Sequence, residues 1–166
     1  MQPPMLSIAM PTRNRPGLLE RALQSVVSAV APVAEYIEVA VSDGSDDDAT
    51  GRVVRRVLTG WPAEYRYVWN RPALSLVENL NRAVEISTGQ WVMQLHDDDY
   101  LLPGAGAAML NAIRRAAPGE SVLLFGVHIV DIDGVRRREQ TFRRERYLQR
   151  REAVRRLLRN SIWCGG

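Results

Sequence analysis

The sequence predicts an α/β protein: a three-layer α/β/α sandwich built around a mostly parallel sheet. Short apolar runs alternate four times with segments of helical spacing, and polar clusters follow the runs directly. Short connections with right-handed crossovers place such runs in one sheet. The 166 residues, 46% of them hydrophobic, are enough for one globular domain with its own core.

The first half of the chain contains two of the predicted strands. Residues 6–10 form an apolar run that Pro11 closes, and a helix then extends to Pro32. Residues 36–42 form the second strand, which stops at the turn signal of residues 43–45. A capping residue and a first-turn proline mark the start of the first helix, namely Asn14 and Pro16.

The acidic residues after the second strand fall into two groups. Asp43 comes directly at the end of the strand. Asp46, Asp47 and Asp48 lie where the next helix should begin, and acidic side chains in a first helical turn stabilise the helix dipole without any ligand. Asp43 is therefore the stronger candidate for a site.

The second half of the α/β pattern contains the remaining strands. Residues 65–69 predict a third strand that ends at Asn70-Arg71-Pro72, and a helix follows over residues 76–87. The apolar run from Gln90 to Leu95 is too short for a typical helix and predicts a buried parallel strand. An Ala-rich helix follows from Pro103 to Ala117.

Three consecutive carboxylates, Asp97, Asp98 and Asp99, end the fourth strand. Ligands of open α/β sheets bind at the carboxyl ends of the strands. Two carboxylates about 4 Å apart repel by about 4 kcal/mol at an effective dielectric constant near 20, so the cluster calls for a cation, and a divalent metal with oxygen ligands is the obvious candidate. The alternative is a solvated acidic loop that caps the helix beginning near Pro103.

The C-terminal part of the sequence differs in charge from the rest. Residues 135–166 hold 11 arginines and 3 glutamates, whereas residues 1–134 hold 11 arginines and 16 acidic residues. A tail of this kind attracts nucleic acid, anionic lipid or a phosphorylated substrate, or it is the solvated face of a helix over residues 147–159. Asp131 and Asp133 are interpreted as turn formers, with Asp133-Gly134 as a hairpin turn.

Targeting and redox signals are few. The sequence shows neither an apolar run of 18 residues nor a charged-then-apolar leader, which makes a cytoplasmic protein the expectation. The single Cys164 cannot form an internal disulfide and is interpreted as a small apolar side chain.

The three polar clusters, in their order and spacing, resemble glycosyltransferase family 2, the inverting nucleotide-sugar transferases of the GT-A fold, which has a Rossmann-like nucleotide-binding half. The family has a Pro-Thr-containing turn, an Asp-Gly-Ser or similar turn, and then the DXD signature. Residues around the signature, Asn81, Ala83, 89–92 and 101–103, also match the family pattern. The matching segments are residues 11–14, 42–45 and 96–99.

The resemblance implies roles for individual residues. Asp98 matches the second Asp of DXD, and the resemblance implies that Asp98 and its neighbour Asp99 bind a metal ion. The implied cofactor is Mn²⁺ or Mg²⁺. His96 stands where many members have the first Asp. Arg71 is a weaker candidate for the donor pocket. The nucleotide-binding set is Pro11, Thr12, Arg13, Asp43, Asn81 and Asp97.

The resemblance also implies partners: a nucleoside-diphosphate sugar donor and a carbohydrate or lipid-linked acceptor, in the synthesis of bacterial polysaccharide or glycoconjugates. Nucleic acid is not an expected partner. Residues 1–134 would form the nucleotide-sugar-binding core, and residues 135–166 the start of the acceptor side. Peripheral contact with the inner face of the membrane and self-association near Ile162 and Trp163 fit this picture.

The catalytic base is unknown from the sequence. In the family this base is an Asp or Glu well after the DXD, which places it beyond Gly166. The sequence therefore predicts donor binding with little or no glycosyl transfer by this chain, apart from slow donor hydrolysis.

Two other classes of function stay open. A metal-dependent nucleotidyltransferase also places carboxylates at strand ends, but it calls for a Gly-rich phosphate loop where this chain has only Gly17. A non-catalytic module that binds nucleotide or nucleic acid would use the Arg-rich tail, which lacks aromatic interleaving beyond Phe142 and Tyr147.

Overall fold

The computed structural model describes residues 3–116, 123, 125–131 and 133–140. The chain divides into two compact units, Met1–Arg115 and Ala116–Gly166. The sequence predicts a functional division after residue 134, between a nucleotide-sugar-binding core and the start of the acceptor side. That division stays a prediction. Within the described residues, no helix has both the length and the apolarity needed to cross a membrane.

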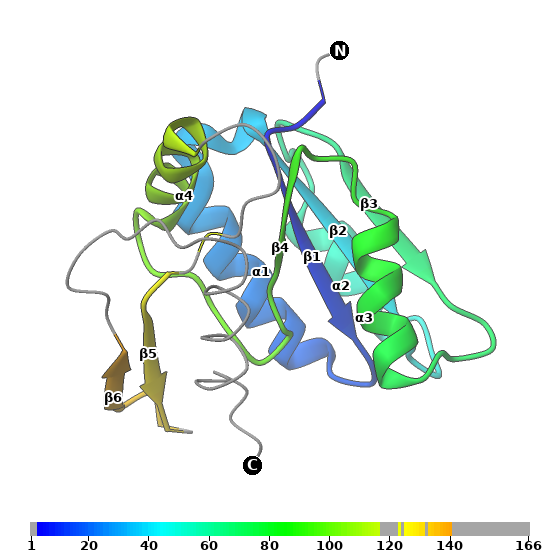
Figure 1. Cartoon of the computed structure of the whole chain (residues 1–166). Coiled ribbons are helices and arrows are strands. Elements are labelled where there is room, and N and C mark those ends of the chain that lie inside the picture. Colours follow the sequence, from blue (N-terminus) through cyan, green and yellow to red (C-terminus); the bar gives the residue numbers. More distant parts are fainter. Residues whose placement is uncertain (1–2, 117–122, 124, 132, 141–166) are drawn as a thin grey trace. The chain divides into compact units, whose positions relative to one another are not determined.

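The first unit is built on a four-stranded parallel sheet with the strand order β3-β2-β1-β4 (Figure 1). The strands are β1 (Leu6–Thr12), β2 (Ile37–Asp43), β3 (Tyr65–Trp69) and β4 (Trp91–Gln94). All pairings in this sheet are parallel. Each strand lies on an apolar run that the sequence predicts, so the α/β fold class is confirmed.

Strand β1 is longer than the sequence predicts, because Pro11 does not close it. Pro11 pairs in register with Ser42, and the strand ends at Thr12. The carbonyl of Ala9 accepts a hydrogen bond from Leu95, so the amide position two residues further on, that of Pro11, faces the same side. Strand β4 has already ended at Gln94 on that side. The next bond of a parallel ladder would run from the amide of residue 11 to the carbonyl of Leu95, so the pairing of β1 with β4 ends where the proline lacks its N–H.

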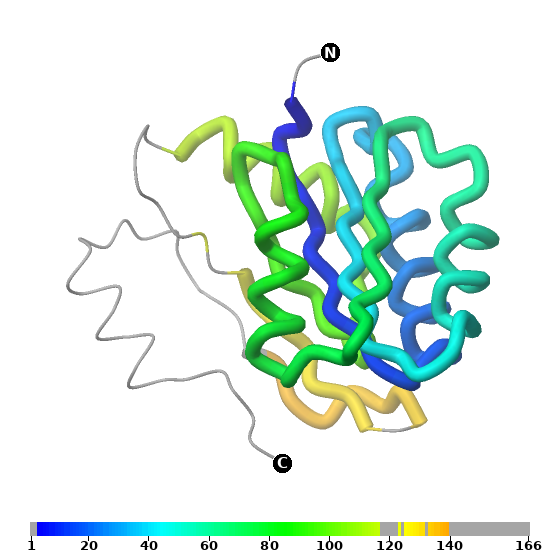
Figure 2. The backbone as a smooth tube through the Cα atoms, turned by 90° about the vertical axis from the view of Figure 1, so that its right-hand side faces the viewer, coloured from blue at the N-terminus to red at the C-terminus, as the bar shows by residue number. Residues whose placement is uncertain are grey.

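Helices cover both faces of the sheet and complete the three layers. Helices α1 (Pro16–Val30) and α2 (Ala49–Val57) lie on one face, and α3 (Leu76–Glu85) lies on the other (Figures 1 and 2). The 3₁₀ helix η1 (Ala31–Tyr36) leads into β2, and α4 (Ala105–Arg115) packs beside α1.

The two faces of the sheet carry side chains of different size. Register and alternation place Ser7, Ala9, Ala40 and Ser42 on the face toward α3, where Ser42 donates a hydrogen bond to Asn79 of that helix. These small side chains let the helix approach the sheet closely. The opposite face carries the large buried apolar side chains of the core, among them Ile8, Met10, Val39 and Val41.

Strand β4 is not the buried strand that the sequence predicts. Both β1 and β2 are buried at every position, whereas the residues of β4 alternate between intermediate burial and exposure, and Val92 is 41% exposed. The reason is the strand order, because β4 is the edge of the sheet within the described residues. An apolar run shows that a strand exists without showing its place in the sheet.

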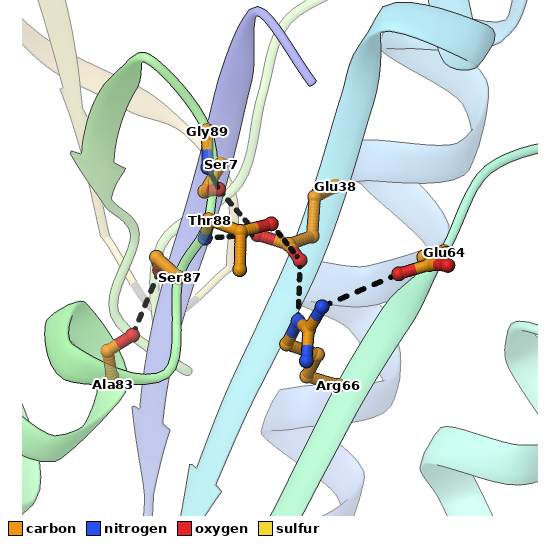
Figure 3. A network of polar contacts seen from close by, with 8 residues as sticks. All are labelled: Ser7, Glu38, Glu64, Arg66, Ala83, Ser87, Thr88 and Gly89. Carbon is orange, nitrogen blue, oxygen red and sulfur yellow. Dashed lines mark hydrogen bonds and ion pairs between the residues drawn. The ribbon is translucent and has the colours of Figure 1, made fainter. Parts of the chain in front are cut away.

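A polar network joins the strands at their amino ends (Figure 3). The carboxylate of Glu38 is buried and accepts hydrogen bonds from the hydroxyl of Ser7, from Nε of Arg66 (2.8 Å) and from the amide of Thr88 (2.8 Å). The hydroxyl of Ser7 in turn accepts from the amide of Gly89 (2.8 Å). One buried carboxylate thus connects three strands and the turn before the fourth.

The described part of the second unit contains an antiparallel hairpin of β5 (Val127–Val130) and β6 (Arg136–Gln140). Gly134 lies in the turn at φ +77°, a conformation that favours glycine. Asp131 accepts hydrogen bonds from the amides of Asp133 and Val135, so the predicted hairpin turn is confirmed. The predicted helix over residues 147–159, together with Ile162, Trp163 and Cys164, lies outside the described residues.

Candidate functional site

The polar clusters that follow the strands meet at the carboxyl edge of the sheet. The amide of Gly44 donates to the carbonyl of Thr12 (3.0 Å), and the amide of Asn70 donates to the carbonyl of Asp43 (2.7 Å). The hydroxyl of Thr12 donates to Oδ2 of Asp97 (2.8 Å), 85 residues further along the chain. The structure therefore brings Thr12, Asp43 and Asp97 of the predicted nucleotide-binding set to one edge.

Asn14 links the loop after β1 to the loop after β2 through hydrogen bonds. Its amide donates to Oγ of Ser45 (2.8 Å), its Nδ2 donates to Oδ2 of Asp46 (2.8 Å), and its Oδ1 accepts from the amide of Asp46 (2.9 Å). The residue has φ +55°, a left-handed conformation that asparagine tolerates better than most residues. The predicted N-cap role is wrong, since Arg15 is the N-cap and makes no side-chain capping bond.

Arg15 is a residue of the site that sequence reasoning missed. Its Nη1 lies 3.3 Å from Oδ1 of Asp97 and 3.6 Å from Oδ2 of Asp98. The prediction of a metal assumed that the acidic cluster has no cation beside it, and Arg15 corrects that assumption. Its proximity to the acids follows from the return of the chain at Asn14, which spacing in the sequence does not reveal.

Asp43 is fully buried at the end of β2, and both of its carboxylate oxygens are used within the protein. Oδ1 accepts from the amide of Ser45 (2.8 Å), and Oδ2 accepts from the hydroxyl of Tyr67 (2.7 Å). Burial and the hydrogen bond to Asp43 raise the pKa of Tyr67 well above its usual value. Contact between Asp43 and a base or ribose stays a prediction, which requires one of these bonds to be shared or exchanged.

A buried amide cluster lies beneath the strand ends, on the face toward α3. Asn79 donates to the carbonyl of Thr12 (3.0 Å) and accepts from the hydroxyl of Ser42 (2.7 Å), and Asn70 donates to the same hydroxyl (2.9 Å). Asn79 is a second missed residue. The available signal was its position four residues before the buried Ala83, because residues four apart share a helix face.

Asn81, the predicted nucleotide-binding residue of this helix, is exposed. Two residues of helix turn the side chain by about 200°, so Asn81 points away from the face that carries Asn79. The structure does not bring Asn81 to the strand ends. Pro11 is buried within β1, and the side chain of Arg13 is half-exposed with Nη2 3.9 Å from Oδ1 of Asp46.

The acidic turn contains three carboxylates in different environments. The side chain of Asp97 is 7% exposed, whereas that of Asp98 is 57% exposed. Partial desolvation and the charge of Asp98 raise the pKa of Asp99. Among the described residues, no group of three or more His, Cys, Asp or Glu side chains is arranged to hold a metal ion.

Two further features border this edge. The guanidinium of Arg71 stacks 3.8 Å over the ring of Trp69 and donates to the carbonyl of Asp46 (2.8 Å). Asp47 accepts from the amide of Ala49 at the start of α2 (2.8 Å), which is the helix-start role that the sequence favours.

A parallel sheet whose strand ends carry these polar side chains defines an α/β protein of the class that binds its ligands at the carboxyl edge. The sequence model of the family described as Glycosyl transferase family 2 matches residues 7–165. The chain therefore belongs to glycosyltransferase family 2, as its motifs predict.

Several known proteins are similar to this chain. An uncharacterized protein of Mycobacterium tuberculosis is 30% identical over 134 residues, which cover 80% of this chain and 39% of the relative. The GalNAc(5)-diNAcBac-PP-undecaprenol beta-1,3-glucosyltransferase of Campylobacter jejuni is 30% identical over 132 residues, 79% of this chain and 40% of the relative. The chain thus spans about two fifths of the length of these curated relatives. Among solved structures, S. aureus TarS matches 71% of this chain and 23% of its own, with 22% identity and a TM-score of 0.49.

Proposed function

We propose that the protein acts in the transfer of a sugar, with inversion, from a nucleoside-diphosphate sugar to an acceptor hydroxyl, with Mn²⁺ or Mg²⁺ as cofactor. The observation that carries the proposal is the meeting of Thr12, Arg15, Asp43 and the Asp97–Asp98 pair at the carboxyl edge of the sheet. Membership of glycosyltransferase family 2 supports glycosyl transfer as the kind of reaction.

Features at the start of α1 favour binding of the donor's diphosphate. The helix begins with Pro16 and has neither a side-chain cap nor an acidic residue in its first turn. The helix dipole therefore presents partial positive charge that no carboxylate of its own first turn neutralises. The guanidinium of Arg15, which is 54% exposed, adds a full charge at the same place.

The residues of the acidic turn fit a divalent ion that binds together with a nucleotide. Mg²⁺ prefers oxygen ligands, keeps several waters, and is usually held by one or two carboxylates plus the phosphates of its substrate. The exposed carboxylate of Asp98, next to Asp99, suits this arrangement, and a preformed group of three side chains is not needed. When bound, the ion would act as a Lewis acid toward the leaving diphosphate.

Other residues of the site would position the reactants. Arg15 would orient the diphosphate, and Thr12 would hold Asp97 so that the acidic turn keeps its shape. An acceptor hydroxyl must be deprotonated as it attacks the face of the sugar opposite the leaving group. Both carboxylate oxygens of Asp131 serve the hairpin, since Oδ2 accepts from Arg137 (2.6 Å). This arrangement favours a turn role for Asp131 over that of catalytic base.

For the acceptor we propose a lipid-linked glycan. The relative from Campylobacter jejuni carries undecaprenol-linked saccharide in its name, and an acceptor of that kind would bring the protein to the cytoplasmic face of a membrane.

Calorimetry tests the proposal. UDP, GDP and dTDP are titrated into the protein with Mn²⁺ and with EDTA. We expect heat of binding for at least one nucleotide and a clear loss of affinity in EDTA. Equal affinity under both conditions would remove the metal from the proposal, and absence of binding by all three nucleotides would overturn the donor class.

Asp98→Asn and Asp47→Asn form a matched pair for the metal role. Each change removes one negative charge from an exposed loop next to a strand end. We expect Asp98→Asn to weaken Mn²⁺-dependent nucleotide binding by about tenfold or more, equivalent to about 1.4 kcal/mol. Asp47→Asn should leave binding unchanged and cost about 0.3–1 kcal/mol of stability at the helix start. Equal effects of the two changes on binding would contradict the role given to Asp98.

A further inference from the structure

Arg15 occupies an unusual place among the arginines at this edge of the sheet. One nitrogen, Nη1, contacts both the buried carboxylate of Asp97 and the exposed carboxylate of Asp98. Nε and Nη2 take no part in these two contacts. The guanidinium thus neutralises the acidic turn while part of it stays available to a ligand.

The position of Arg15 is built by the surrounding loop. Asn14 is held at φ +55° by its bonds to Ser45 and Asp46, which turns the chain back toward the end of β4. Pro16 fixes the first turn of α1 on the other side. Thr12 binds the second oxygen of Asp97, so the carboxylate that Arg15 contacts is fixed as well.

In this geometry, Arg15 and a divalent ion would compete for the carboxylate of Asp98. A cation at the exposed carboxylate of Asp98 would lie within a few ångströms of a guanidinium of the same sign, and like charges at that range repel strongly. A diphosphate changes the balance, because arginine pairs with phosphate oxygens in a bidentate manner, whereas its contacts to Asp97 and Asp98 use the single nitrogen Nη1 at 3.3 and 3.6 Å.

We propose that Arg15 is a built-in counter-cation of the acidic turn, which blocks binding of the metal alone and transfers to the diphosphate when nucleotide and metal arrive together. Metal binding is thereby made dependent on the nucleotide. This inference rests on the proposed function for its second half, while the block of metal binding concerns the protein without nucleotide.

The test compares Arg15→Gln with Arg15→Lys and with Arg56→Gln. Arg56 is an exposed arginine paired with Glu20 (2.7 Å) on the outer surface of α1 and α2, so its change removes the same charge from a similar ion pair outside the site. Binding of Mn²⁺ alone is measured from the electron paramagnetic resonance signal of the free ion. Binding of UDP, GDP and dTDP with Mn²⁺ is measured by calorimetry, and circular dichroism checks that each variant is folded.

We expect opposite effects of Arg15→Gln in the two measurements. Mn²⁺ alone should bind about tenfold more tightly, the order expected when one nearby unit charge is removed at a surface. The Mn²⁺-dependent affinity for nucleoside diphosphate should fall by about tenfold or more. Arg15→Lys keeps the charge and should bind Mn²⁺ alone as weakly as the wild type does, and Arg56→Gln should match the wild type throughout.

Two results would overturn the inference: Mn²⁺ affinity of Arg15→Gln within twofold of the wild type, or nucleotide affinity that does not fall. Failure of the proposed function shows separately, as wild-type protein that binds nucleotide equally with Mn²⁺ and with EDTA. Arg15→Gln that still gains affinity for Mn²⁺ in that case would support the counter-cation role alone.

Discussion

Single side chains at the carboxyl edge are held by partners from distant parts of the chain. Thr12 reaches Asp97, and Asn14 reaches Asp46, so each residue joins two loops that follow different strands. A change at one of these positions therefore acts on the loop opposite to it as well as on its own.

Asn14 offers a test of this coupling. Asn14→Ala removes both side-chain bonds to Asp46 and forces a residue with a Cβ and no compensating bond into the left-handed conformation. We expect a loss of about 1–3 kcal/mol in the free energy of unfolding, measured with urea.

Asn14→Gly is the control, because glycine accepts φ +55° and lacks the side-chain bonds. Its loss should be smaller than that of alanine by about 1 kcal/mol. Equal losses for the two variants would show that the backbone conformation contributes nothing measurable.

At the scale of elements, the amino ends of the strands depend on close contact between main chains. A Cβ at Gly89 would lie 2.6 Å from the amide nitrogen of Ser7 and 2.7 Å from its hydroxyl. The turn between α3 and β4 therefore approaches β1 as closely as glycine permits.

Gly89→Ala should accordingly destabilise the protein. The backbone atoms of a central strand cannot move aside cheaply, and we expect a loss of at least about 2 kcal/mol in urea unfolding. Gly17→Ala is the matched control, because nothing lies within 4 Å of its Cβ position in the first turn of α1. That change should leave stability equal or raise it by up to about 1 kcal/mol. A stable Gly89→Ala protein would mean that β4 can shift relative to β1.

At the scale of the whole molecule, Glu38 couples folding to pH. Burial raises the pKa of this carboxyl, but the hydrogen bonds from Ser7, Thr88 and Arg66 outweigh burial, and the net pKa is lowered. The folded state thus binds the proton more weakly than the unfolded chain does. The stabilisation is complete above the unfolded pKa, about 4.3 for a glutamate, and is lost as pH falls through the lower folded value.

Unfolding in urea between pH 3 and pH 7 tests this linkage. The free energy of unfolding of the wild type should fall on acidification below about pH 4.3. Glu38→Gln should be about 1–3 kcal/mol less stable at pH 7 and show a shallower acid slope. Glu85→Gln, an exposed glutamate paired with Arg82, serves as the control. An unchanged slope in Glu38→Gln would place the acid sensitivity elsewhere.

The sequence patterns predicted the order of strands and helices well. They predicted poorly which side chains contact one another at the site. The apolar runs of β1 and β2 reflect burial over the whole strand, whereas β3 and β4 were found from their sequence although they are only partly buried. The edge position of β4, the length of β1 and the face that Asn79 occupies all depend on which elements pack together. Arg15 was missed for the same reason, since only the folded loop places it beside Asp97 and Asp98.

The parallel pairing of β1 with β4 also has a consequence for synthesis of the chain. Thr12 and Asp97 are 85 residues apart, and ribosomes add about 5–20 residues per second. At that rate, the edge of β1 that pairs with β4 stays unpaired for roughly 4–17 s. During this interval the nascent chain presents unpaired amides and carbonyls of a strand that is buried at every position in the finished protein. Such an edge is what chaperones shield and what other nascent chains pair with, so soluble yield from rapid overexpression should respond to temperature and to added chaperones.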